Sequence, residues 1–361
     1  MDVIQYKCPN CGGDLQFDPA TGAYACQYCR SKFSQSDIDK QTEEKTQQAG
    51  SDSSPASADI NDSADQTDSA AEDARVYSCP SCGAQIMTDA TTAATFCYYC
   101  HNPVVLSGRL EGAYKPDYVA PFKIDRKQAL QIFEDWVAKK KYVPSAFYSK
   151  DQIEKFSGVY FPYMLYTCNI AGRISAQATK TTVEVRNGIE YTDRGVYQVD
   201  RDGNMEVKDV MRIALKKANG ALAEGVLPFE TEEIKPFNMS YLSGFMAEKR
   251  DMDKSDFEEE VTQEVRDYAV EQLRQSVAGY EDIRITSDNT RLLNEKWKYV
   301  LMPVWTLTYK AGEKIYYFSV NGQTGKTLGE LPVDEGKLRK RFLMIFIPVA
   351  LVLLAIFYFL F

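Results

Sequence analysis

The sequence predicts a multidomain chain: two small four-cysteine modules, an acidic disordered linker, an α+β domain with an antiparallel sheet, and one C-terminal transmembrane helix. Three observations predict it: a cysteine pattern that occurs twice, a long acidic stretch between the copies, and an uncharged apolar segment near the last residue. With 361 residues, 44% of them hydrophobic, the chain can fill the core of more than one compact unit. The predicted segments are the first module at 1–33, the linker at 34–75, the second module at 76–108, the α+β domain at 109–336, a basic juxtamembrane segment at 337–341 and the transmembrane helix at 342–361.

Eight of the nine cysteines form two copies of one pattern, C-x2-C, then 14 residues, then a second C-x2-C. Four thiolates on two short turns provide the tetrahedral shell of a structural Zn²⁺ site, and a closed shell leaves no position for substrate or water. A module of about thirty residues also needs the metal, because its apolar core is small. The predicted ligands of two zinc ions, one per zinc ribbon, are Cys8, Cys11, Cys26, Cys29, Cys79, Cys82, Cys97 and Cys100.

Paired disulfides, or an iron centre held by the same four thiolates, are the alternatives at each cluster. The first residues lack the basic and apolar regions of a signal peptide, which favours reduced thiols in a cytoplasmic setting. The ninth cysteine, Cys168, lies in an aromatic stretch and is predicted to be a small buried hydrophobic residue. The one histidine, His101, is predicted to be a surface residue beside Cys100, so no catalytic triad or HExxH site can be assembled.

The linker from Ser34 to Arg75 has 11 acidic residues, 3 basic residues and no aromatic residue. A segment so charged and so poor in apolar groups does not offset the entropy of ordering, so we predict that it is disordered and tethers the first ribbon without docking it. Its charge accounts for most of the formal net charge of −9 of the whole chain.

The charges of the ribbons do not favour nucleic acid as a partner. Residues 1–33 have three basic and three acidic side chains, and residues 77–108 have no lysine or arginine. Four thiolates around Zn²⁺ add a further negative charge at each site. Tyr28, Tyr98 and Tyr99 offer stacking surfaces, but stacking without a basic groove is a poor platform for nucleic acid, so we expect protein partners.

The sequence offers no small-molecule site that we can name. NGQTGKT at 321–327 ends like a phosphate-binding loop, but the glycine needed five positions before Gly325 is replaced by Val320. We predict a strand, an Asn-Gly turn and a second strand there.

Within 109–336, two segments are predicted to be helices. The first has Asp125 as its N-cap and Gln128 three residues later, and its apolar residues Ala129, Ile132, Phe133, Trp136 and Val137 share one face. The second follows Ser255, with Glu258 completing a capping box and Val261, Val265, Tyr268 and Leu273 as the apolar face.

Strands are predicted on both sides of two Gly-containing turns, Asn187-Gly188 and Asp202-Gly203, which suit two-residue hairpins. Two further aromatic strands contain Pro162 and Pro303 and are predicted to be edge strands, because proline cannot donate a hydrogen bond within a sheet. The domain is therefore expected to be α+β with antiparallel pairing.

Phe342 to Phe361 has 20 residues and no charge, a length of about 30 Å as a helix, which matches the hydrocarbon core of a bilayer. Four basic residues in 337–341 come directly before it. Because basic flanks stay on the cytoplasmic side, we expect a single-pass protein of the cell membrane, with the large N-terminal part in the cytoplasm.

These features resemble a family of bacterial membrane-anchored proteins, mainly Gram-positive, described as TFIIB-type zinc-ribbon-containing proteins. The likeness rests on CPNCGG, CPSCGA, GVYFPYMLY, PFNMSYLSGF, LMPVWTLTY and VNGQTGKTLGELP, and on the apolar C-terminal segment. Some members are similar to membrane anchors that act with phage-shock protein A and a flotillin-like SPFH protein in envelope stress, so the resemblance implies partners of those types.

The function expected from these features is that of a non-enzymatic, tail-anchored membrane scaffold whose cytoplasmic zinc ribbons and α+β domain recruit protein partners, in envelope stress or membrane maintenance. The alternative is a membrane-tethered regulator that binds nucleic acid or acts in transcription, which the ribbon type itself suggests. An enzyme in the α+β domain is a third reading, for which the sequence names no site.

Overall fold

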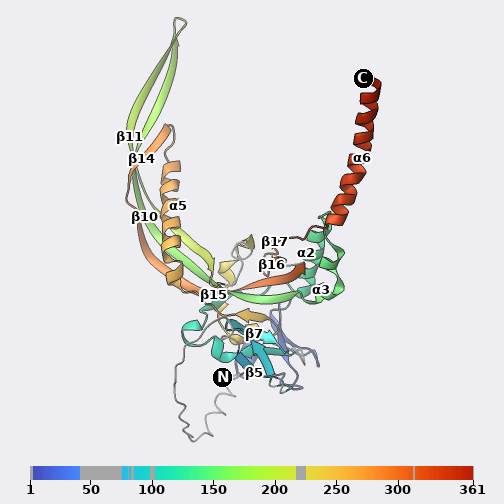
Figure 1. Cartoon of the computed structure of the whole chain (residues 1–361). Helices are drawn as coiled ribbons and strands as arrows, with labels where there is room; N and C mark the ends of the chain where they lie inside the picture. Colours follow the sequence, from blue (N-terminus) through green and yellow to red (C-terminus); the bar gives the residue numbers. More distant parts are fainter. Residues whose placement is uncertain are drawn as a thin grey trace, which may run out of the picture. The chain divides into compact units, whose positions relative to one another are not determined.

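The computed structural model describes residues 3–40, 75–79, 81–82, 85–97, 102–216, 225–311 and 314–360. The chain divides into two compact units, which we call the ribbon unit and the hairpin unit (Figure 1). The ribbon unit comprises Met1–Phe161, Lys217–Lys249 and Leu301–Phe361, and the hairpin unit comprises Pro162–Lys216 and Arg250–Val300. The predictions for Tyr98, Tyr99, Cys100 and His101, and for the linker at 41–74, lie outside the described residues.

Strands of the large sheet follow the order β1-β8-β7-β13-β10-β15-β16-β17 along its main path. In the described part of this sheet, β10 pairs parallel with β13, whereas β1–β8, β7–β8, β7–β13, β9–β12, β10–β11, β10–β14, β15–β16 and β16–β17 are antiparallel pairs. The predicted α+β class with antiparallel pairing is therefore confirmed in outline. The strands are β1 (Val3–Ile4), β2 (Leu15–Asp18), β3 (Ala23–Cys26), β4 (Lys32–Phe33), β5 (Arg75–Ser78), β6 (Gln85–Thr88), β7 (Thr92–Phe96), β8 (Pro103–Leu106), β9 (Tyr118–Val119), β10 (Ser157–Arg186), β11 (Ile189–Ile213), β12 (Lys235–Pro236), β13 (Met246–Glu248), β14 (Glu281–Asp288), β15 (Arg291–Ala311), β16 (Lys314–Asn321) and β17 (Thr327–Gly329).

Helices are fewer than strands in the described part of the chain. The α-helices include α2 (Arg126–Ala138), α3 (Lys150–Glu154), α5 (Glu258–Gln275) and α6 (Glu335–Leu360), and the 3₁₀ helices are η1 (Ser107–Arg109), η2 (Gly112–Tyr114), η3 (Ser145–Tyr148), η4 (Thr231–Glu233), η5 (Met239–Leu242) and η6 (Lys254–Asp256). Residues 35–40 are also helical.

Helix α2 forms as the sequence predicts. The Asp125 carboxylate accepts a hydrogen bond from the Gln128 amide, and the Gln128 side chain accepts one from the Asp125 amide, so the capping box is complete. Such a cap contributes about 1 kcal/mol to helix stability. The helix buries Ala129, Phe133 and Val137.

Aromatic side chains form much of the core of the ribbon unit. Phe122 stacks on Phe245 with a centroid distance of 4.3 Å, and Tyr160 and Trp305 pack against Phe122 at 5.0 and 5.1 Å. Gly322 is required beside them, because a β carbon there would lie 2.6 Å from the Phe122 ring. Each fully buried aromatic side chain stabilises the fold by about 1.5–3 kcal/mol relative to an exposed one.

The prolines of β10 and β15 do not mark edge strands, so that prediction was wrong. Both strands have neighbours on each side. The Pro162 carbonyl accepts a hydrogen bond from Ala214, and its missing N–H falls where the partner of β10 changes from β13 to β11. Likewise, Pro303 accepts from Gly322 where β16 begins to pair with β15. A proline is tolerated inside a sheet where one neighbouring strand ends and the next begins.

Strand β10 changes its burial along its length. Residues 162–166 are buried on both faces, every second residue is buried from 168 to 178, and residues 182–186 are exposed on both faces. Cys168 is fully buried at the start of the alternating part, as predicted, and burial raises the pKa of its thiol. Strand β10 thus begins in the core and ends in a part of the sheet that is exposed on both faces.

One long hairpin replaces the two hairpins that we predicted. Strands β10 and β11 pair from Tyr163–Ile213 to Arg186–Ile189, and Asn187 and Gly188 form the predicted two-residue turn with φ of 53° and 78°. The turn predicted at Asp202-Gly203 is wrong: Gly203 lies within β11, opposite Gly172. Figure 1 shows the hairpin continuing past the ends of α5 and β14.

Helix α5 packs on one face of this hairpin. It buries Val261, Val265, Ala269 and Leu273, whereas the predicted core residue Tyr268 is 52% exposed. The capping box predicted at Ser255 and Glu258 is also wrong, because Asp253 and Asp256 form one in η6 and α5 begins after Phe257. Beyond the helix, Val277 packs on Ala178 and Val199 of the hairpin.

Helix α6 is long and apolar enough to span a membrane. The candidate span, Glu335–Phe357, contains an 18-residue window with a mean hydropathy of 2.3, and none of this window is buried within the protein. The helix begins before the predicted 342–361 segment and includes the basic residues of 337–341. Pro348 lies inside it, as expected for a tolerated proline in such a helix.

Candidate metal centres

The four cysteines of the first ribbon lie together. All four sulfur atoms are within 4.8 Å of one another. The Sγ atoms of Cys8 and Cys29 are 3.5 Å apart, as are those of Cys11 and Cys26. These separations are far too long for a disulfide bond, whose sulfur atoms are about 2.05 Å apart.

The arrangement fits a tetrahedral metal. Zn–S bonds of about 2.3 Å place the sulfurs of a tetrahedral shell about 3.8 Å apart, close to the observed distances. The donor set is four thiolates, which suits Zn²⁺ and also iron. A metal held by all four would have no open coordination position, so its chemistry would be structural.

Each cysteine turn of the first ribbon repeats the same backbone hydrogen bonds. The Cys8 amide donates to the Gly13 carbonyl and the Gly12 amide donates to the Cys8 carbonyl. Cys26 and Arg30 repeat the two bonds in the second turn, with Ser31 as the acceptor for Cys26. Gly12 and Arg30 occupy the equivalent position with φ of 72° and 60°, a conformation that glycine adopts without strain.

The two thiols exposed at this cluster have opposite pKa shifts. Hydrogen bonds from the Ser31 hydroxyl and backbone lower the pKa of Cys29 to about 6. A backbone hydrogen bond from Gly13 also acts to lower the pKa of Cys11, but the neighbouring thiols of Cys29 and Cys26 outweigh it and raise the value to about 12.

The second ribbon shows the same arrangement in its described residues. Cys79, Cys82 and Cys97 lie within 4.8 Å of one another, and the Cys97 amide donates to the Asn102 carbonyl as Cys26 does to Ser31. In both ribbons the first cysteine of a turn is buried and the second, where described, is exposed. Seven of the eight predicted ligands are thus brought together as predicted, and Cys100 lies outside the described residues.

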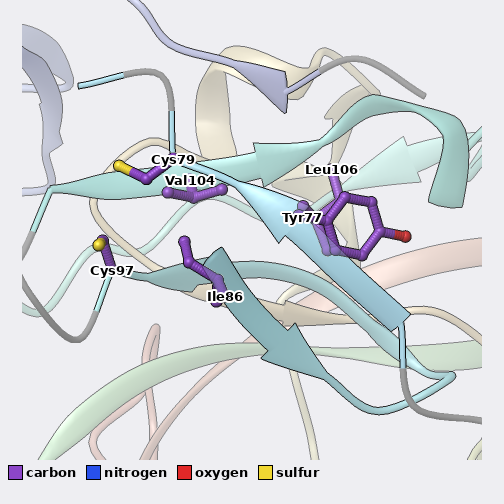
Figure 2. Packing of buried hydrophobic residues seen from close by; sticks show 6 residues of the cluster. All are labelled: Tyr77, Cys79, Ile86, Cys97, Val104 and Leu106. Atoms are coloured by element: carbon purple, nitrogen blue, oxygen red, sulfur yellow. The ribbon is translucent and has the colours of Figure 1, made fainter. Parts of the chain in front are cut away.

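A small apolar cluster supports the second metal centre. Figure 2 shows Cys79 and Cys97 at one end of it and Tyr77 and Leu106 at the other, with Ile86 and Val104 between them. The Tyr77 hydroxyl accepts a hydrogen bond of 2.8 Å from Nε of Arg109, which is only 4% exposed. Arg109 also donates to the Ala90 carbonyl, so this buried cation ties the ribbon to the start of the α+β part.

The first ribbon is docked on the remainder of the ribbon unit, which contradicts our prediction that it is only tethered. Its β1 pairs with β8 of the second ribbon. The Phe17 amide donates to the Ser243 carbonyl, and the Phe17 ring packs edge-on against Tyr241 at 5.3 Å. Tyr24 is fully buried, with its hydroxyl 2.7 Å from that of Ser240.

The linker also begins later than the predicted Ser34. Residues 35–40 are helical and Ile38 is fully buried. Gln35 donates to Ser240, and Asp39 accepts from Asn238. The low content of apolar residues led us to predict disorder there, but one buried isoleucine and these polar contacts hold the segment in place.

A surface hollow of about 530 Å³ lies between the ribbons, with Cys11, Tyr28, Ser81 and Asn102 among its lining residues. Tyr28 is 73% exposed, and its ring lies so close to Gly13 that a β carbon there would collide with it. This explains the second glycine of CPNCGG, which the metal alone does not require.

Sequence reasoning did not identify the polar residues around the first cluster. Lys7 forms an ion pair with Asp14 at 2.5 Å and also donates to Ser81 of the second ribbon. Ser31, two residues after the last cysteine, donates the hydrogen bond that favours the Cys29 thiolate. The position of Ser31 at the end of the turn is the one signal that could have identified it.

The loop at 321–327 connects β16 and β17, as the strand–turn–strand prediction requires. Its Asn321 is fully buried, donates to the carbonyls of Val226 and Pro228, and accepts from the amides of Gln323 and Thr324. Gly325, with φ of 75°, completes the turn. These contacts hold the loop against the segment that contains Val226 and Pro228.

Comparison with known proteins gives one informative match. The chain is 29% identical over 335 residues to a Bacillus subtilis protein described as "Uncharacterized protein YdjG", and the match covers 93% of this chain and 92% of that protein. No protein-family model matches the chain, and no solved structure matches it. The match covers most of the length of both chains, so it is not limited to the cysteine motifs.

Proposed function

We propose that this chain is a non-enzymatic membrane scaffold: α6 spans the cell membrane, and the metal-bound ribbons with the α+β body recruit protein partners on the cytoplasmic side. The observation that carries the proposal is the setting of the first cysteine cluster. Its four sulfurs form a closed shell, the ribbon is docked on a folded body, and an exposed tyrosine lies beside the metal position. Such a site presents a rigid surface rather than a reactive group.

The hollow between the ribbons is the recruiting surface in this proposal. Tyr28 offers an aromatic ring of the kind enriched at protein interfaces, and its position on Gly13 holds the ring with little loss of entropy on binding. Ion pairs of Lys7 with Asp14 and Lys32 with Asp18 occupy two of the three basic side chains of the ribbon. This leaves little positive charge for phosphates, which favours protein over nucleic acid.

Helix α6 supplies the membrane attachment. Its first turn is held to the body, since Lys337 donates to the Val143 carbonyl and lies 3.6 Å from Asp334. The remaining basic residues, Arg339, Lys340 and Arg341, are exposed before the apolar stretch. In that position they suit the cytoplasmic side of an anionic membrane. Proteins of the phage-shock A and SPFH types are the partners that the family resemblance implies.

Cross-linked capture from native membranes with the full-length chain tests the proposal. Tyr28→Ala is compared with Tyr268→Ala, which removes another exposed tyrosine from the surface of α5. We expect a specific protein to be captured by the parent chain and by Tyr268→Ala, and lost with Tyr28→Ala while the metal content is unchanged. Equal capture by all three, or salt-sensitive recovery of nucleic acid in place of protein, would contradict the proposal.

A further inference from the structure

Strand β11 leaves one of its edges open. It pairs with β10, and in the described part of the chain no other strand pairs with it. Its side chains at Asp193, Arg194, Val196, Tyr197 and Asp200 are exposed. An open edge presents unpaired backbone N–H and C=O groups and can accept another strand.

The sequence of this edge is complementary to itself. It reads DRGVYQVDR from Asp193 to Arg201. If two copies align antiparallel about Tyr197, Arg194 lies opposite Asp200 and Asp193 lies opposite Arg201. Symmetry repeats each pair, so four oppositely charged pairs flank the central tyrosines. Slipping the alignment by two residues in either direction leaves both Asp193 and Arg201 without an opposite charge.

From this complementarity we propose that a second copy of this chain docks on the open edge of β11, and that the two β11 strands pair antiparallel about Tyr197 to form one continuous sheet. The axis relating the copies passes between the two Tyr197 residues. Because each copy uses its one β11 edge, the assembly closes at two chains. Directly opposite charges stabilise paired strands, and like charges there destabilise them.

The faces of the hairpin agree with this register. Arg194 and Asp200 are paired within the chain with Thr181 and Ser175, on the face away from α5. Asp193 and Arg201 are paired with Thr182 and Ile174, on the other face. Each attractive pair between copies therefore joins side chains on the same face of the extended sheet.

The exposed apolar residues near the tip of the hairpin would also be covered by the second copy. Tyr191 and Ile189 are 53% and 57% exposed. In the proposed register Tyr191 lies opposite Gly203 of the other copy, and Ile189 lies opposite Met205. Gly203 has no β carbon, and a methyl group of Leu273 from α5 lies 3.6 Å from where one would be. An aromatic side chain opposite a glycine in a neighbouring strand covers the exposed backbone.

Both residues of the Arg194–Asp200 pair have a partner within the chain: Ser175 donates a hydrogen bond to the Asp200 carboxylate, which can accept further bonds, and Asp282 pairs with Arg194. Arg194 lies 2.8 Å from Asp282 at the start of β14, and both side chains are more than 60% exposed. An exposed ion pair of this kind contributes little, about 0–1 kcal/mol, so it does not hold Arg194 away from a second copy. Removing the competitor with Asp282→Ala should leave the association unchanged or strengthen it.

The test uses full-length chain in detergent micelles, with donor- and acceptor-labelled samples mixed and energy transfer measured against concentration. We expect the parent chain to form dimers. Arg194→Asp and Asp200→Arg should each weaken association about tenfold or more, because each variant places two like-charged pairs across the axis. Arg284→Asp makes the same charge change on β14 and should leave association unchanged.

Mixing the two variants provides the decisive measurement. Arg194→Asp mixed with Asp200→Arg restores every opposite pair, so the mixture should form mixed dimers at concentrations at which neither variant dimerises alone. The double variant Arg194→Asp/Asp200→Arg should dimerise again by the same reasoning. Circular dichroism and thermal unfolding check that each variant is folded. A monomeric parent chain, assembly beyond two chains, or no recovery in the mixture of folded variants would overturn the proposal.

Discussion

The two ribbons share one cysteine spacing but are built into the protein in different ways. The first has its own three-stranded sheet, β2-β3-β4, which docks through Phe17 and Tyr24. In the second, β5 and β6 form a separate two-stranded sheet, while β7 and β8 continue into the large sheet. The spacing therefore determines the sulfur cluster, whereas the partners of the intervening strands depend on residues far away in the chain.

Removing the metal should give the largest difference in stability between the two ribbons. Structural Zn²⁺ contributes roughly 10–16 kcal/mol in isolated zinc-finger peptides, so strands whose only strand partners lie within a ribbon depend on it most. With chelator, we expect the amides of β2, β3 and β4 to lose hydrogen-exchange protection, while β7 keeps protection because it pairs with β13. If β7 and β3 lost protection equally, the pairing of β7 with the large sheet would not stabilise β7 in the absence of metal.

Variants of the cysteines sharpen this test. Elemental analysis should find about two zinc ions per parent chain and about one in Cys26→Ser or Cys97→Ser. Cys168→Ala, which removes the buried thiol outside the clusters, should keep both. If the parent chain contained iron in place of zinc, the assignment of zinc would be wrong, but the assignment of the eight ligands would stand.

Phe17→Ala should undock the first ribbon without emptying its metal site. The substitution removes a ring that is 94% buried between Tyr24 and Tyr241, at a cost of about 3–5 kcal/mol. Zinc content should be unchanged, and hydrogen exchange should rise in β2 and β3 but not in β8. Loss of one zinc ion would mean that docking and metal binding are a single event.

Matched hydroxyl deletions compare the polar anchors of the ribbons. Tyr77→Phe leaves Nε of the buried Arg109 without its acceptor and should cost about 1–3 kcal/mol in the free energy of unfolding. Tyr24→Phe should cost about 1 kcal/mol, because Ser240 keeps Gln35 as a partner. Urea unfolding measures both, and the reverse order would show that the Arg109 contact is not a stabilising anchor.

Acid should loosen the segment at 35–40 by a smaller amount. The Ser34 hydroxyl and amide donate to Asp37 and hold the pKa of that carboxyl below its ordinary value of 3.8. A lowered pKa in the folded state gives stability that is present above the ordinary value and is lost as the pH falls through the folded pKa. Amide exchange at Ile38 should therefore rise below about pH 4. Asp37→Asn should show faster exchange at neutral pH and no further rise from this source.

The sequence predicted the parts of this protein that depend on short-range patterns. The cysteine spacing, the Asp125 cap, the Asn187-Gly188 turn and the apolar helix were all recognised because neighbouring residues determine them. What failed depended on distant partners. Asp202-Gly203 has the composition of a turn, but pairing with Gly172 keeps it in a strand.

The predictions for the two prolines and for the first ribbon failed for the same reason, because they also depend on distant partners. Pro162 and Pro303 suit the middle of a sheet because partner strands change beside them, which no local pattern reveals. The docking of the first ribbon depends on Ser240 and Tyr241, more than two hundred positions after Phe17. At the metal centres, the ligands were predictable, but the supporting Tyr77–Arg109 contact was not.

The long separation between Tyr24 and Ser240, 216 positions, has a consequence for synthesis on the ribosome. All four cysteines of the first ribbon have been translated by Cys29. At roughly 5–20 residues per second, its docking residues follow about 10–40 seconds later. During that interval the docking residues of the nascent ribbon have not been synthesised. Early binding of a metal ion would therefore keep the ribbon folded until they are translated.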